Sequence, residues 1–375
     1  MKNNIILFFV TILICVLAIE HTSAILVKRL LSFKYNPKVY KELSEPQGYT
    51  KEIIKFYDQH YKDLHHLREI SNHIIKKPSD LIFKKIGDGE TKVLIQGDSW
   101  AEQYYTRYSK EHIQQYAEKL DCQIIEAGVS SYSPSLMTAQ LNKIRNNFNI
   151  NPDYIVAVID QTDIGDELCR YKDLRQIIGG DVVIRPEPAE SNGVYKYPLL
   201  IEKYNALYAD SFAIKKIYHY LIFRLKSTLI QHRSKKVKCN SNDILGVLKT
   251  GISLDDENYI IGVISDYIDT AFKKSNLKKL IIVTHPHSNH LNKIYSLNIE
   301  KLISKAVDYS NFKNKIQIIS FSNELSKASN LEIAGIYRFR DVYSHLNHQY
   351  FLDYVLPKVF KAVTISMKNN NKLLK

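Results

Sequence analysis

Five short apolar runs, each separated from the next by a longer segment, constrain the fold of this chain most. The runs occupy residues 93–95, 122–126, 154–159, 279–284 and 316–321. Between them, apolar residues recur at three- and four-residue spacing, as in 135–148 and 296–309, which is typical of helices with one buried face. Strands joined by helices pair in parallel and need helical cover on both faces. The sequence therefore predicts an α/β domain of flavodoxin-like type, with a parallel sheet between two helical layers.

The N-terminal residues have the character of a targeting segment. Lys2 precedes an apolar stretch over residues 5–19 and small residues at 22–24, a pattern typical of a secretory signal peptide. Apolar residues resume at Ile25, so an uncleaved membrane anchor is the alternative interpretation of residues 1–24. Either interpretation places the remaining chain outside the cytoplasm, in the periplasm or at the cell surface.

The rest of the chain divides by the same patterns. Residues 25–88 have apolar positions at helical spacing and predict a helical extension. The α/β domain then covers residues 89–366, with an insertion at about 172–242, where the alternation of strands and helices breaks. Residues 367–375 form a basic tail rich in Lys and Asn.

Composition narrows the class of partner. The formal net charge of +13 is spread along the chain and is compatible with acidic partners. No zinc-finger spacing and no basic-aromatic motif is present, so we expect no nucleic-acid partner. Three cysteines follow the targeting segment without metal-like spacing, and they allow at most one disulfide; Cys122, beside an apolar strand, is expected in the core. No cofactor is expected.

Polar residues follow several of the predicted strands directly. Ser99 ends the first run in Gly97-Asp98-Ser99, Gly128 follows the second run, and residues 160–163 follow the third. His345 precedes the last predicted helix. Because the carboxyl ends of parallel strands share one edge of a sheet, these residues are expected to converge. A serine, a histidine that takes its proton and backbone amides that hold an oxyanion are sufficient for acyl transfer.

In this order, the segments resemble the sequence blocks of the SGNH (GDSL-like) hydrolase superfamily, which contains serine esterases and related O-acetyltransferases. The blocks are Gly97-Asp98-Ser99, Ala127–Ser133, Pro152–Val156 with Asp163–Asp166, and His345–Asn347. The resemblance covers roughly residues 91–363 outside the insertion. It implies that Ser99 is the nucleophile and His345 the base, and that the backbone amides of Ser99 and Gly128 line the oxyanion hole.

Two positions depart from the family pattern. Thr162 stands where the family has an asparagine that donates to the oxyanion, and Gln161 is the alternative donor if the loop shifts. The family aspartate lies two or three residues before the histidine, whereas the nearest acid here is Asp341, four residues before His345. We expect Asp341 to orient the imidazole, and a Ser–His pair without an acid is the alternative.

Two further segments carry residues that could contact a substrate. Trp100, beside the nucleophile, is expected to line either the core or the substrate pocket. His285 and His287 lie in Thr284-His285-Pro286-His287-Ser288-Asn289-His290, in the loop after the fourth core strand, and are pocket candidates. This segment is also similar to the histidine motif of metallo-β-lactamase-type hydrolases. We expect no metal here, because Asn289 replaces the aspartate of that motif and few residues remain downstream.

These features together predict an extracytoplasmic serine esterase or O-acyltransferase. The expected substrate is an acyl ester, acetyl above all, carried by a glycan or a similar small molecule, and the N-terminus is a possible membrane attachment. The alternative is a catalytically impaired member that binds or scaffolds during assembly of a cell-surface polysaccharide. A metallohydrolase using His285, His287 and His290 is the third hypothesis.

Overall fold

A computed structural model describes residues 10–22, 77–184, 251–291, 297–325, 335–337 and 345–373, except positions 107 and 274, and the single residues 8, 56, 218 and 225. Residues 10–22 form a helix that belongs to one compact unit of the chain. The sheet and its helices belong to a second unit, made of His60–Arg68, Ser79–Pro186 and Lys238–Lys375. No helix in the described ranges is long and apolar enough to cross a membrane.

The centre of the second unit is a six-stranded sheet, ordered β1-β3-β2-β4-β7-β8. Its strands are β1 (Lys84–Ile86), β2 (Thr91–Gly97), β3 (Cys122–Gly128), β4 (Tyr154–Val158), β7 (Lys279–Thr284) and β8 (Ile316–Ser320). All pairings are parallel except that of β1 with β3. Numbered along the chain, the five parallel strands have the spatial order 2-1-3-4-5 of doubly wound sheets. The predicted fold class and all five predicted strands are confirmed.

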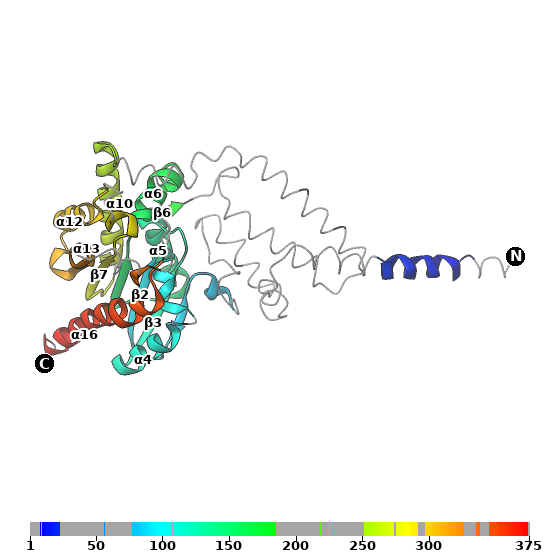
Figure 1. Cartoon of the computed structure of the whole chain (residues 1–375), viewed down its shortest axis with the longest axis horizontal. Helices are drawn as coiled ribbons and strands as arrows, with labels where there is room; N and C mark the ends of the chain where they lie inside the picture. Colours follow the sequence, from blue (N-terminus) through cyan, green and yellow to red (C-terminus); the bar gives the residue numbers. More distant parts are fainter. Residues whose placement is uncertain are drawn as a thin grey trace. The chain divides into compact units, whose positions relative to one another are not determined.

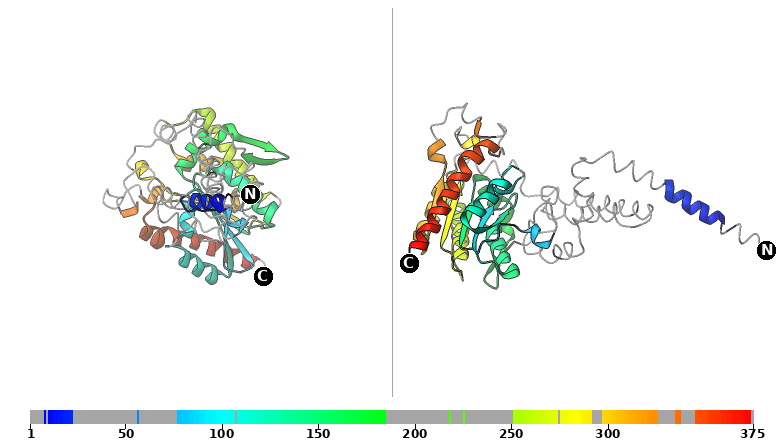
Figure 2. Two further views of the ribbon diagram at one scale, coloured as in Figure 1. Left: turned by 90° about the vertical axis from the view of Figure 1, so that its right-hand side faces the viewer. Right: turned by 90° about the horizontal axis from the view of Figure 1, so that it is seen from below.

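Helices cover both faces of this sheet (Figure 1 and Figure 2). The α-helices are α4 (Lys110–Leu120), α5 (Pro134–Phe148), α6 (Gln161–Asp166), α10 (Leu254–Phe272), α11 (Ser288–Leu291), α12 (Ile299–Tyr309), α13 (Ser322–Leu325), α15 (His348–Tyr350) and α16 (Leu356–Leu373). Buried side chains of α4 and α16 pack in one core with alternate residues of β2, β4 and β7. On the other face α10 lies between α5 and α12. The four central strands, β3, β2, β4 and β7, are buried on both faces, which explains why their sequences contain continuous apolar runs.

Short helical turns connect several of these elements. The 3₁₀ turns are η1 (Pro78–Leu81), η2 (Ala101–Tyr105), η4 (Lys172–Leu174) and η5 (Lys313–Lys315), and the π-helical turns are η3 (Glu167–Tyr171) and η6 (Phe351–Val355). The helical segment between β2 and β3 is therefore split into η2 and α4. The break occurs where the Ser109 hydroxyl accepts from the Thr106 amide and donates to the Gln103 carbonyl.

Two expected boundaries differ from the structure. β1 lies inside residues 25–88, which we expected to be helical; the earlier part of that extension lies outside the described residues, apart from position 56. The strand has only three residues and two of them are lysines, so it lacks a detectable apolar run. In the expected insertion at 172–242, strands β5 (Arg175–Ile178) and β6 (Asp181–Ile184) form an antiparallel hairpin, and most of the remainder lies outside the described residues.

The cysteines that the structure describes have different environments. Cys122 is free and buried in the core, as predicted, and burial raises the pKa of its thiol to about 11. Cys15 is free and exposed. Cys169 is disulfide-bonded.

Gly97, the last residue of β2, has a backbone conformation that requires glycine. Its φ is +147°, and a Cβ there would lie 2.4 Å from the Val158 carbonyl oxygen of β4. Gly97→Ala is therefore expected to lower the free energy of unfolding by roughly 1–3 kcal/mol, measured by urea denaturation. The control is Gly262→Ala in α10, where a Cβ meets nothing within 4 Å. This control should raise stability by about 0.5–1 kcal/mol, because alanine is the better helix former. Equal effects of the two substitutions would contradict the prediction.

Candidate functional site

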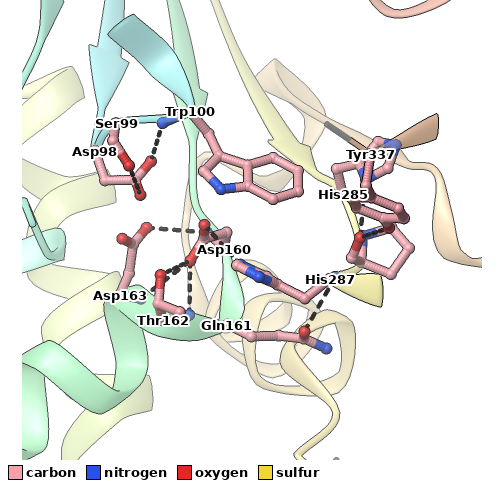
Figure 3. A network of polar contacts seen from close by, with 11 residues as sticks. Asp98, Ser99, Trp100, Asp160, Gln161, Thr162, Asp163, His285, His287 and Tyr337 are labelled. Carbon is pink, nitrogen blue, oxygen red and sulfur yellow. Dashed lines mark hydrogen bonds and ion pairs between the residues drawn. The ribbon is translucent and has the colours of Figure 1, made fainter. Parts of the chain in front are cut away.

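The candidate site lies at the carboxyl ends of β2, β4 and β7 (Figure 3). Its residues belong to the loop after β2 (residues 98–100), the start of α6 (160–163) and the loop after β7 (285–287). β2 lies between β3 and β4, so the strand order reverses here. A reversal of this kind opens a crevice at the strand ends, where doubly wound proteins bind their ligands.

Ser99 is half-buried at this edge and hydrogen-bonds to its neighbour. Its hydroxyl donates to Asp98 Oδ2 at 3.2 Å. The other oxygen of this carboxylate, Oδ1, accepts from the Trp100 amide at 2.8 Å. Asp98 thus fixes the tight turn after β2 and holds the serine hydroxyl at the same time.

The expected oxyanion donors differ in their availability. The Gly128 amide donates to Glu126 Oε1 at 2.8 Å, and the Thr162 hydroxyl donates to Asp160 Oδ1 at 2.7 Å. The Ser99 amide has no hydrogen-bond partner among the described residues. Of the three expected donors, Ser99 alone therefore has an unengaged proton in this conformation.

A buried Asp–His pair joins the loops after β4 and β7. His287 Nε2 lies 3.0 Å from Asp160 Oδ2, and both side chains are at most 2% exposed. Asp160 is also the N-cap of α6, because its Oδ1 accepts from the amides of Thr162 and Asp163. Burial on its own would raise the pKa of Asp160, but His287 and these hydrogen bonds lower it below its usual value.

The sequence alone does not predict Asp160 as the partner of His287. The spacing of Asp160 and Asp163 after a strand is a signal for a capped helix, and the structure contains the full capping box. The sequence predicts His287 as a pocket residue, and in the structure its Nε2 lies 3.0 Å from Oδ2 of the cap residue Asp160. The Asp160–His287 pair could not be predicted from local sequence, because its two residues lie in loops that are far apart in the chain.

The Trp100 ring lies close to the rings of three histidines. Its ring centroid is 4.7 Å from that of His287, 5.3 Å from His285 and 6.5 Å from His345. The indole is 4% exposed and packs in the core. Of its two expected environments, the structure gives the core, at the point where the core meets the histidine rings.

His285 is held in one tautomer by its neighbours. A carbonyl can only accept, so Nδ1 donates to the Pro286 carbonyl oxygen at 2.9 Å. Nε2 then carries no proton and accepts from the Tyr350 hydroxyl at 3.1 Å. Burial, above all, lowers the pKa of His285 to about 3. Both ring nitrogens are thus used within the protein.

This low pKa predicts a loss of stability in acid. Between about pH 6.5 and pH 3 the unfolded chain binds a proton at His285 that the folded chain excludes, so stability falls as the pH falls. The contribution has a slope of up to about 1.4 kcal/mol per pH unit. In urea denaturation at pH 7.5 and pH 5, His285→Gln should lose less stability than the parent chain. A larger loss in the variant would contradict this assignment.

Three buried carboxyl groups meet beside Ser99. One oxygen each of Asp98, Asp160 and Asp163 lies within 4.8 Å of the others. Burial, followed by the negative charge of Asp160, raises the pKa of Asp98 well above its usual value. Burial and the charges of Asp98 and Asp160 do the same for Asp163. On the same helical segment, burial raises the pKa of Asp166 to about 7.

The remaining predicted residues have these positions. His345 is half-buried and near the Trp100 ring. Asp341 lies outside the described residues, so its expected contact with His345 stays a prediction. The side chain of His290 also lies outside the described part of the chain.

Comparisons with known proteins gave distant structural likenesses only. No family model and no curated protein matches the chain. One similar solved structure is an acetyl xylan esterase (Est2A) from the rumen bacterium Butyrivibrio proteoclasticus, with TM-score 0.28 and 10% identity. The match covers 63% of this chain and 56% of the esterase, just over half of its length. Another is an α/β hydrolase fold protein of unknown function, with TM-score 0.27, 10% identity and coverage of 74% of this chain and 89% of the other.

Proposed function

We propose that this protein is a serine ester hydrolase or O-acyltransferase with Ser99 as its nucleophile. The observation that carries the proposal is the position of Ser99 at the strand-order reversal, half-buried, with histidine rings grouped around the adjacent Trp100. Sites at this edge collect residues from separate loops, as acyl transfer requires. The resemblance of the sequence blocks to SGNH hydrolases supports the same assignment.

In the proposed reaction, His345 accepts the proton of the Ser99 hydroxyl while Oγ forms a bond to the ester carbonyl carbon. For this step the hydroxyl leaves Asp98 Oδ2, its partner in the structure. The Ser99 amide donates to the developing oxyanion, and a small shift of Glu126 or Asp160 would free the Gly128 amide or the Thr162 hydroxyl. Collapse expels the alcohol, which takes the proton from His345. Water or a sugar hydroxyl then releases the acyl group.

The proposed substrate is an acyl ester, acetyl above all, on a glycan or a similar small molecule outside the cytoplasm. The targeting pattern of residues 1–24 supports this location. The disulfide at Cys169 supports it as well, because disulfides persist in oxidising compartments. Side chains of the helix at residues 10–22, such as Leu13, Ile14 and Leu17, are more than half exposed and suit attachment to a membrane.

A second candidate function is a binding or scaffold protein with an impaired site. Two observations favour it: the Ser99 hydroxyl donates to a carboxylate, and both Gly128 and Thr162 have their protons engaged. If this arrangement persists in solution, the site lacks both an activated serine and a complete oxyanion hole. The fold would then present a crevice for a ligand without reaction.

A fluorophosphonate probe separates the two candidates, because it labels only an activated serine. The folded protein should be labelled at Ser99, as located by peptide mass spectrometry, and the heat-denatured protein should not. Ser130→Ala, on the neighbouring loop at the same sheet edge, serves as the control and should label like the parent chain. Absence of labelling in the folded protein would favour the impaired binder.

A further inference from the structure

The group of Asp98, Asp160 and Asp163 has a property that the proposed reaction does not use. All three side chains are at most 3% exposed. Full ionisation would place three negative charges within 4.8 Å of one another, away from water. Such an arrangement is strongly unfavourable unless a proton or a cation compensates it. The hydrogen bonds of the three carboxylates indicate whether a proton or a cation is present.

Asp160 has little capacity left for another ligand. Its Oδ1 accepts from the Thr162 amide, the Thr162 hydroxyl and the Asp163 amide, and its Oδ2 pairs with His287. Hydrogen bonds to the charged form, together with His287, keep this carboxylate ionised. A cation at this place would therefore depend on Asp98 and Asp163 alone, which is few ligands for a hard divalent ion. This favours a proton.

One carboxyl oxygen of Asp163 is suited to carry this proton. Its Oδ2 accepts from the Asp160 amide at 2.9 Å, whereas Oδ1 is buried and has no hydrogen-bond partner among the residues that the structure describes. Figure 3 shows this carboxyl group directed toward that of Asp98. An orphaned buried carboxylate oxygen is costly, but a protonated one becomes a donor. The Asp98 carboxylate, with an oxygen within 4.8 Å of an oxygen of Asp163, is the neighbouring acceptor.

We infer that Asp163 is a neutral carboxylic acid at pH 7, and that Asp163 and Asp98 form a proton-sharing pair that positions Ser99. The proton resides on Asp163 Oδ1 and is directed to the Asp98 carboxylate. Asp98 remains an acceptor and holds the turn through Trp100 and the hydroxyl of Ser99. Asp163 is thus a positioning residue that acts through Asp98. The pair itself is independent of the reaction, whereas its effect on Ser99 reactivity rests on the proposed function.

Other titratable groups lie near this pair and affect the pKa values of its two carboxyl groups. Asp160 and Asp166 act on Asp163, and Glu102 and Asp160 act on Asp98. His287 contacts the group through Asp160. The charges of Asp160, Asp166 and Glu102 are negative, so they oppose ionisation of the pair. The pKa of Asp163 is higher in the folded chain than in the unfolded chain. The free energy of unfolding therefore falls as the pH rises from the unfolded pKa to the folded pKa, above which both members of the pair are negatively charged.

Infrared spectroscopy tests the protonated acid directly, without reference to activity. At pH 8 the parent chain should show a protonated-carboxyl band that Asp163→Asn lacks. Asp121→Asn, the same change at an exposed position, is the control and should retain the band. A band that is unchanged in Asp163→Asn would overturn the inference.

Thermal unfolding provides the second measurement. Asn supplies an amide donor where the acid has its proton, so Asp163→Asn should unfold at a higher temperature than the parent chain. The difference should grow from pH 4 to pH 8 and reach about 2–4 °C or more. Added Ca²⁺ or Mg²⁺ should leave both melting temperatures unchanged. A rise in the parent chain alone would identify a cation in place of the proton and overturn the inference.

Reactivity toward the fluorophosphonate probe tests the effect on Ser99. Asp163→Ala should be labelled about tenfold more slowly than the parent chain, and Asp163→Asn should restore most of the rate. Equal rates in Ala and Asn variants would overturn the positioning role. If the parent chain itself is not labelled, the proposed function fails, while the infrared and thermal results still decide whether the proton is shared.

Discussion

Replacement of Ser99 by alanine is expected to reduce hydrolysis of 4-nitrophenyl acetate to the background rate, a loss of about 10³-fold or more. The substitution removes the oxygen that attacks the carbonyl carbon, and no other hydroxyl is placed at the end of β2. The fold should persist, because Ser99 is half-buried and its side chain makes a single hydrogen bond within the described part of the chain, to Asp98. Far-ultraviolet circular dichroism and the melting temperature check this.

The comparison with His345 sharpens the result. His345→Ala should lose activity to a similar extent, and the double variant Ser99→Ala/His345→Ala should be no slower than Ser99→Ala. This non-additivity is expected when two residues act in the same chemical step. Ser130→Ala, a matched change at the same sheet edge, should keep the parent rate. Retention of turnover in Ser99→Ala would remove the proposed mechanism.

The sequence predicts the layers of this fold well because its central strands are buried on both faces. Each parallel strand gives a continuous apolar run, and each flanking helix gives a periodic one, so their alternation is visible without any tertiary information. The strand order places residues after β2, β4 and β7 at one edge, as expected. β1 is not predicted in this way, because its stability derives from pairing with β3 and its three residues form no apolar run.

The site is predictable only to the level of which loops meet. His287 and Asp160 are 127 residues apart, and their bond depends on the directions of two side chains at the sheet edge. The same holds for the hydrogen bonds that engage Gly128 and Thr162, since a sequence block names the residue and not its partner. Rotamers and burial decide these contacts, and neither is encoded in local spacing.

Asp160→Ala is expected to lower the free energy of unfolding by about 3–5 kcal/mol, measured by urea denaturation at pH 7. Two losses add in this variant. The amides of Thr162 and Asp163 lose their cap, which alone costs about 0.5–2 kcal/mol. His287 also loses its buried partner. Ser253→Ala in α10 is the control, because Ser253 is an exposed cap and its loss should cost about 1 kcal/mol.

A double-mutant cycle isolates the Asp160–His287 pair from the cap. His287→Gln alone leaves the cap in place, and the double variant Asp160→Ala/His287→Gln should be less destabilised than the sum of the single changes. The stabilisation by the Asp160–His287 pair depends on pH. Because the pKa of Asp160 is lower in the folded chain, this stabilisation is fully present above the pKa of the unfolded chain. It is lost as the pH falls through the pKa of the folded chain. The coupling should therefore be present at pH 7 and diminish in strong acid. Simple additivity at pH 7 would show that Asp160 acts through the helix cap alone.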